Sequence, residues 1–175
     1  MYKYATCLFL VLLPAGAQEI RFPESFEKLA AKAKEAVTVS LDGNMLQLAG
    51  NFLSGRSTGE AAAKQLAGDL KGIYVRSFQF EKEGEYTEAD VAPVRAQLTS
   101  ERGWSGVVNI TEPAERVEVY VKKDASRVLG MTVLVSEKRE LTVVYIDGPI
   151  DLKRLGELLP KGLNAAVEKG MAGKQ

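Results

Sequence analysis

The sequence predicts an α+β fold, in which amino-terminal helices pack on a mostly antiparallel sheet of five to six strands. Two patterns predict it. Apolar residues recur at spacings of three and four in the first half of the chain, and they mostly alternate at a spacing of two in the second half. Only three or four residues, most of them polar, separate the later strands, which favours hairpins. We therefore expect the sheet to end in a β-meander, followed by a carboxyl-terminal helix.

Helical spacing predicts four helices before the meander, over residues 24–36, 44–53, 57–70 and 88–99. In the second, Asn44 caps the helix and Met45 shares a face with Phe52. Ser57 begins a capping box in the third, and Thr87 caps the fourth. Pro93 lies inside the fourth helix and disfavours a straight course by roughly 3 kcal/mol.

Alternating residues predict strands at 37–41, 73–81, 106–111, 116–122, 127–136 and 140–147. In the second strand the alternation changes phase, which indicates either two covered faces or a bulge near Ser77. In the fourth strand, valines alternate with Glu118, Tyr120 and Lys122, so we expect one face in water. The last two strands are apolar on both faces and should be central, covered either by helices on both sides or by helices and a partner.

The end of the sheet and the carboxyl-terminal segment are marked by turn and cap residues. Gly148 and Pro149 should end the last strand, and Asp151 should cap a leucine-rich helix that stops at Pro160. The length suits one domain. We expect a signal peptide over residues 1–17, a single α+β domain over residues 18–160 and a frayed tail over residues 161–175.

The first seventeen residues have the pattern of a secretory signal peptide. Lys3 is followed by an apolar run over residues 5–13, then by Pro14 and the small-x-small sequence Ala15–Ala17. A buried helix or a membrane anchor is the alternative, but the run is too short to cross a bilayer, which needs about 20 residues. We expect cleavage after Ala17, export into a compartment that permits disulfides and no membrane anchor afterwards.

The composition excludes several classes of function. The chain has 175 residues, 23 Lys and Arg against 23 Asp and Glu, no His and one Cys. Without His, a Ser-His-Asp triad and a His-ligated metal are excluded. The balanced charge gives no electrostatic attraction to nucleic acid. The one cysteine, Cys7, lies in the predicted signal peptide, so the exported protein should contain no disulfide.

A carboxylate pair for hydrolysis could come from two places: Glu81, Glu83 and Glu85 in one turn, or Asp147 and Asp151 at a strand end and a helix cap. Turn and cap roles explain each of these residues without catalysis. The sequence therefore predicts no catalytic residue, no cofactor and no metal ligand.

Two other side chains stand out. Arg76 lies within an apolar strand, where it either snorkels to the sheet edge or pairs with a carboxylate, with anion binding as a weaker alternative. Trp104 should plug the start of the meander, with ligand stacking as the alternative.

Three segments carry a family resemblance: Lys71–Phe80, Tyr86–Val91 and Glu140–Leu152. In this order they resemble a family of small exported bacterial proteins, domain of unknown function 4252, over residues 26–158. Pro93 departs from the helix expected there. The resemblance implies an exported protein, periplasmic in a Gram-negative cell, and a loose association with envelope sigma-factor neighbourhoods. It carries no known activity, so it transfers no catalytic residue.

Three functions remain open at the level of the sequence. The first is a non-enzymatic envelope protein that binds another protein, as a stress-response accessory. The second is a carrier of an apolar small molecule, in a pocket lined by Met45, Phe52, Phe78 or Met131. The third and weakest is a carboxylate-dependent hydrolase.

Overall fold

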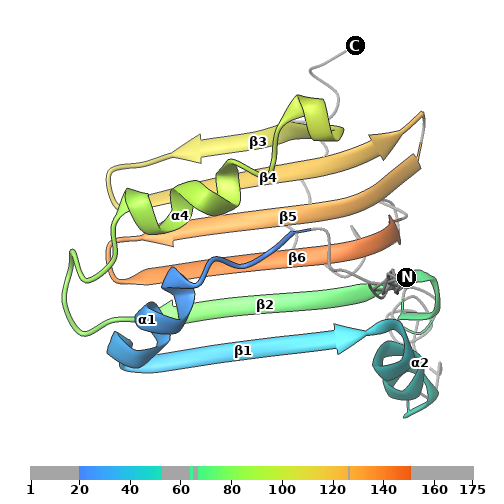
Figure 1. Ribbon diagram of the computed structural model, residues 1–175, viewed down its shortest axis with the longest axis horizontal. Coiled ribbons are helices and arrows are strands. Elements are labelled where there is room, and N and C mark those ends of the chain that lie inside the picture. Colours follow the sequence, from blue (N-terminus) through green and yellow to red (C-terminus); the bar gives the residue numbers. More distant parts are fainter. Residues whose placement is uncertain (1–19, 53–63, 65–66, 126, 151–175) are drawn as a thin grey trace, which may run out of the picture.

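A computed structural model describes residues 20–52, 64, 67–125 and 127–150 (Figure 1). These residues form a sheet and the helices that pack on it. The predicted signal peptide, most of the predicted helix from Ser57, the helix after Asp151 and the tail over residues 161–175 lie outside the described residues.

The centre of the fold is a six-stranded antiparallel sheet, as the sequence predicted. Its strands stand in the order β1-β2-β6-β5-β4-β3 (Figure 1). The last four strands form a meander of hairpins, and β2 pairs with both β1 and β6. The strand bounds are β1 Glu35–Asp42, β2 Gly72–Gln79, β3 Trp104–Thr111, β4 Glu115–Asp124, β5 Arg127–Glu137 and β6 Glu140–Ile150.

The last strand continues beyond its predicted end. We expected Gly148 and Pro149 to stop the sheet, but β6 runs on to Ile150, which pairs with Val128 across a register shift. Gly148 adopts a φ of 122°, and a Cβ there would lie 2.7 Å from the Lys71 amide nitrogen. The glycine therefore allows a bulge that bends the strand without ending it.

The phase change in β2 reflects two covered faces and not a bulge near Ser77. Register is continuous from Gly72 to Gln79 against both neighbouring strands. Phe78 is 1% exposed on the face beneath the helices, whereas Ile73 packs into the cluster on the opposite face. Each half of the strand thus places its larger apolar residues on a different side.

Helices α1 and α4 are shorter than predicted. Helix α1 spans Ser25–Lys32, because the chain turns at Ala33 into β1. Helix α4 spans Glu88–Arg95, and a capping box between Thr87 and Asp90 begins it as expected. Pro93 lacks the amide that would bond one turn back, and α4 ends two residues later. A 3-10 turn, η1 Ser100–Arg102, leads into β3.

Helix α2 spans Gly43–Phe52 and differs from the prediction in its cap and its buried face. The Asp42 carboxylate, and not Asn44, accepts the Met45 amide at 2.9 Å. Met45 is 51% exposed, whereas Leu46 is 4% exposed. Met45, which the sequence offered as a lining residue of an apolar pocket, therefore lies on the exposed side of α2, and the helix contacts the fold through Leu46.

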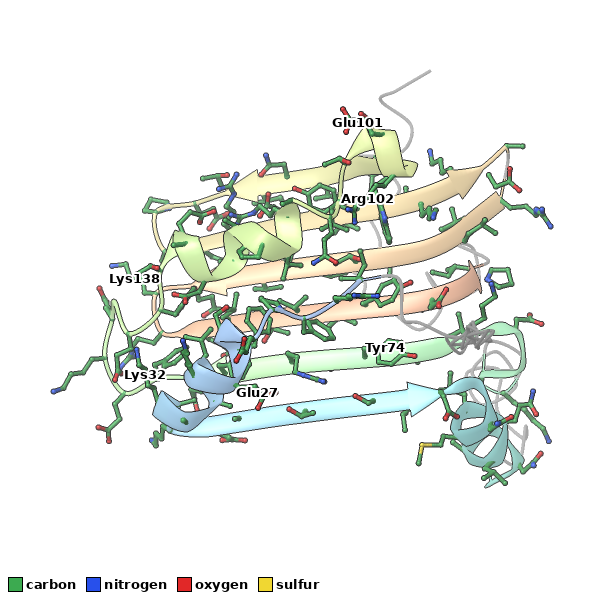
Figure 2. The ribbon with its side chains drawn as sticks, viewed as in Figure 1. Glu27, Lys32, Tyr74, Glu101, Arg102 and Lys138 are labelled. Atoms are coloured by element: carbon green, nitrogen blue, oxygen red, sulfur yellow. The ribbon has the colours of Figure 1, made fainter. Side chains whose placement is uncertain are left out.

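The two faces of the sheet carry separate buried clusters. Helices α1 and α4 lie over one face, the helix face, where side chains crowd together (Figures 1 and 2). Its largest buried residues are aromatic or aliphatic: Phe26, Phe78, Phe80, Trp104, Leu134, Leu141 and Tyr145. The opposite face, the aliphatic face, carries Leu46, Leu70, Val117, Val119, Val121, Val128, Met131 and Ile150.

Candidate functional site

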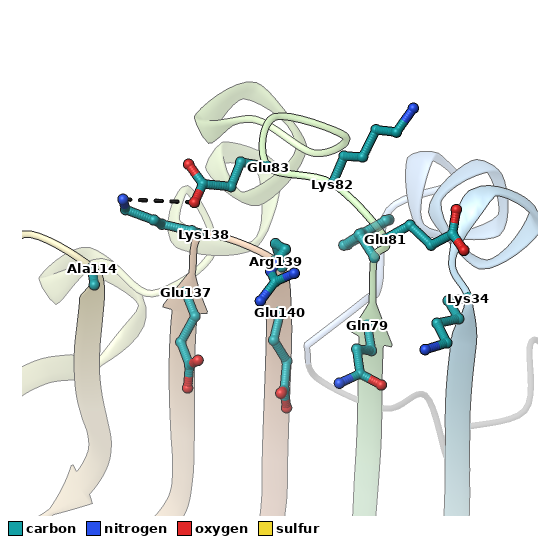
Figure 3. Close-up of a pocket in the computed structure, with 11 residues that line it drawn as sticks. Lys34, Gln79, Glu81, Lys82, Glu83, Ala114, Glu137, Lys138, Arg139 and Glu140 are labelled. Atoms are coloured by element: carbon teal, nitrogen blue, oxygen red, sulfur yellow. Dashed lines mark ion pairs between the residues drawn. The ribbon is translucent and has the colours of Figure 1, made fainter.

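Two of the three glutamates in the acidic turn after β2 have structural roles. Glu85 accepts the Lys82 amide at 2.8 Å, which closes the turn. Glu83 lies 3.7 Å from the ammonium of Lys138 (Figure 3). Glu81 lines a pocket at this end of the sheet. The pairing of Asp147 with Asp151 falls outside the described residues.

That pocket has a volume of about 680 Å³ and lies beside the β5–β6 turn (Figure 3). Four basic and four acidic side chains line it, so its charges cancel: Lys34, Lys82, Lys138, Arg139, Glu81, Glu83, Glu137 and Glu140. A neighbouring pocket of about 310 Å³ shares the β5–β6 turn and is also lined mainly by polar residues. Neither has the apolar lining that a lipid-like ligand requires.

The four residues named for an apolar pocket are not brought together. Phe78 belongs to the helix face and Met131 to the aliphatic face, so the sheet separates them. Met45 is half exposed. The side chain of Phe52 lies outside the described residues.

Arg76 snorkels toward β1, the first of its two predicted roles. Its guanidinium donates to the carbonyl oxygens of Val39 at 3.1 Å and Val75 at 2.9 Å. It also lies over the ring of Phe22, 4.7 Å from the centroid. In the described part of the chain these partners include no carboxylate, so Arg76 links β1 to β2 and to the segment before α1.

Trp104 is the first residue of β3 and is 1% exposed. Its ring meets Tyr145 edge to face, with centroids 6.2 Å apart. The indole therefore plugs the start of the meander, as the sequence predicted, and no face of it is open for stacking on a ligand.

A buried polar cluster lies between α4 and β4, on the face of β4 that the sequence predicted to be exposed to solvent. Glu118 is 4% exposed and accepts from the Arg95 Nε at 2.6 Å and from the Tyr120 hydroxyl at 3.0 Å. Arg95 also pairs with Glu88, and Arg116 Nη2 lies 3.6 Å from Glu118. The prediction of a solvent-exposed face on β4 is wrong, because α4 covers this face and supplies Arg95 as the partner of Glu118.

Tyrosines gather on the same face. Burial raises the pKa of the Tyr120 hydroxyl, and the adjacent Glu118 carboxylate raises it further. Burial is also the main cause that raises the pKa of Tyr86, whose hydroxyl donates to the carbonyl oxygens of Glu137 and Glu140. The Tyr86 hydroxyl ties the β5–β6 turn to the segment before α4, and the Tyr120 hydroxyl joins the Glu118–Arg95 pair, so both have structural roles.

No group of acidic residues in the described part of the chain could hold a metal ion. Within the same residues, no helix is long and apolar enough to cross a membrane.

Among the residues that the structure describes, strand β1 is one edge of the sheet and presents a free flank. Among the described strands it pairs only with β2, in continuous register over its whole length. Residues 36–41 include no charged residue and no proline, and Val37 is 41% exposed. The other edge, β3, is interrupted by a register shift between Gly106 and Val108. Sequence alone did not single out β1, because strand order decides which strands become edges.

Comparison with known proteins gives one result. No curated protein and no solved structure shows a match to the chain. A family model matches residues 26–158, which include all six strands. Because the match covers well over half of the chain, the protein belongs to the family described as a domain of unknown function, DUF4252.

Proposed function

We propose that the protein is an exported, non-enzymatic bacterial envelope protein that binds another protein as a stress-response accessory, using the free flank of β1. The observation that carries the proposal is the edge strand β1, whose middle has no charge, proline or bulge. Natural sheets usually guard such an edge with lysine, proline, a bulge or a covering element, because its unpaired amides and carbonyls accept another strand. The middle of β1 carries none of the first three.

The contrast with β3 supports this choice of surface. Both edges are free of charge in their middle, but β3 is bulged at Gly106, so a regular incoming strand would meet a break in the hydrogen-bonding pattern. Strand β1 offers an uninterrupted ladder from Glu35 to Asp42. Addition of a partner strand to such an edge is a common mode of peptide recognition.

The test is photocrosslinking in cells with a crosslinking amino acid at Thr38, in the middle of β1, and a matched probe at Asn109 on β3. Both side chains are exposed. We expect a crosslinked protein from Thr38 and none from Asn109. Val37→Lys adds an edge-guarding charge at an exposed position and should remove the crosslink without lowering stability. Equal crosslinking from both edges, or a crosslink that survives Val37→Lys, would contradict the proposal.

A further inference from the structure

The side chains of β1 divide between the two faces of the sheet. Ala36, Thr38 and Ser40 stand opposite Phe78, Arg76 and Tyr74 of β2, on the helix face. Val37, Val39 and Leu41 therefore point to the aliphatic face. Any strand that adds to this edge must match that division.

A second copy of β1 can add only in certain registers. In a symmetric antiparallel pair, residues that point to the same face lie opposite each other, so the pairing must be centred on one residue. Centred on Thr38, it sets each Val37 opposite the second copy's Val39. It also sets each Lys34 opposite the second copy's Asp42.

The two neighbouring registers do not place Lys34 opposite Asp42. Centred on Val39, the pairing sets Asp42 opposite Ala36. Centred on Val37, it pairs a shorter length of strand and sets Glu35 opposite Val39. The register centred on Thr38 sets Glu35 opposite Leu41, but of the three registers it alone opposes unlike charges at both ends, with the Val37–Val39 pairs between them.

The residues at both ends are available for this pairing. Lys34 and Asp42 are exposed, and Lys34 makes no ion pair among the described residues. Asp42 uses Oδ1 to accept the Met45 amide, and the group remains on the surface. Val37 is one of four large apolar side chains exposed in the described part of the chain.

We propose that two copies of the chain pair edge to edge through β1, in the register centred on Thr38, and join their sheets into one. The inference rests on the proposed function, since it names a second copy as the partner of that same edge. Lys34–Asp42 pairs fix the register and the valines cover each other.

Reversing the charge at Lys34 or at Asp42 tests whether the partner is a second copy of the chain. Sedimentation should find a concentration-dependent dimer for the native chain. Lys34→Asp opposes two aspartates, and Asp42→Lys opposes two lysines, so each should weaken self-association about tenfold or more. Mixed together, the two variants restore both opposite-charge pairs and should form a heterodimer. Lys28→Asp, on the exposed side of α1, is the matched control and should leave the dimer unchanged.

A second measurement tests the register and does not depend on the α2 cap that Asp42→Lys removes. With Cys7→Ser as background, Thr38→Cys places two sulfurs opposite each other. Ser40→Cys places them four residues apart, about 13 Å along the strand. A short thiol crosslinker should join the first pair and not the second.

Self-pairing would be overturned if the native chain stays monomeric at all concentrations, or if Lys34→Asp and Asp42→Lys leave the strength of dimerisation unchanged. If the Thr38 probe in cells then captures a different protein, in a manner that Val37→Lys abolishes, the proposed function stands and only the second copy is wrong. If the probe captures nothing, both proposals fail.

Discussion

The two faces of the sheet are buried in different ways. The helix face mixes aromatic rings with polar groups, including Glu118, Tyr120 and Thr132. The aliphatic face has a cluster of valine, leucine, isoleucine and methionine, with no polar side chain among its buried members. Neighbouring residues on one strand therefore enter unlike environments, and substitutions at adjacent positions should have different costs for different reasons.

The largest difference is expected between Glu118 and Val119, which are neighbours on β4. Glu118→Ala removes the buried acceptor of Arg95 and Tyr120 and leaves Arg95 only its exposed partner Glu88, so it should cost about 3 kcal/mol or more of stability. Val119→Ala removes two methyl groups from the aliphatic face and should cost about 2 kcal/mol. Urea denaturation of both variants measures the two values.

A double variant separates lost charge pairing from lost packing. Arg95→Met with Glu118→Leu fills the same space with apolar side chains, and it should recover most of the stability that Glu118→Ala loses. If Glu118→Ala costs less than Val119→Ala, the helix face does not depend on its buried ion pair.

Glu118 also shows where sequence reasoning stops. The alternation in β4 correctly predicted a strand, and the short linkers correctly predicted the hairpins. Alternation is the same, however, whether the polar set faces water or a helix that carries the opposite charge. Arg95, the residue that decides, is 23 positions away in the chain. For that reason the burial of Glu118 could not be predicted.

The candidate surface on β1 illustrates a second limit. Residues 37–41 were predicted as a strand, and the family resemblance is confirmed over residues 26–158. Nothing in a strand's own sequence says whether it ends a sheet, because that depends on how strands far apart in sequence are ordered. The edge position of β1 is set by its pairing with β2 alone among the described strands.

A smaller effect is expected at Thr132 and Val133, which are neighbours on β5. The Thr132 hydroxyl is fully buried on the helix face and finds no hydrogen-bond partner among the described residues. Thr132→Val replaces it with a methyl group of similar size and should stabilise the protein by about 1 kcal/mol. Val133→Thr places a hydroxyl on the aliphatic face and should destabilise by a similar amount. Thermal melts of both variants check the signs, and a loss of stability in Thr132→Val would reveal a partner for its hydroxyl.

The smallest effect is a response to alkaline pH that only the helix face should show. Burial and Glu118 raise the pKa of Tyr120 in the folded protein above its ordinary value of about 10. Between those two pKa values the unfolded chain has lost the proton and the folded chain has kept it, so the free energy of unfolding must fall as pH rises. Below pH 10 both states keep the proton and no change is expected from this group.

Urea midpoints at pH 8 and pH 11 should therefore differ less in Tyr120→Phe than in the native chain. Val119→Ala should lower both midpoints equally, because the aliphatic face offers no group that titrates there. An undiminished pH response in Tyr120→Phe would assign the effect to the other tyrosines of the helix face, Tyr74 and Tyr86, whose pKa values burial also raises.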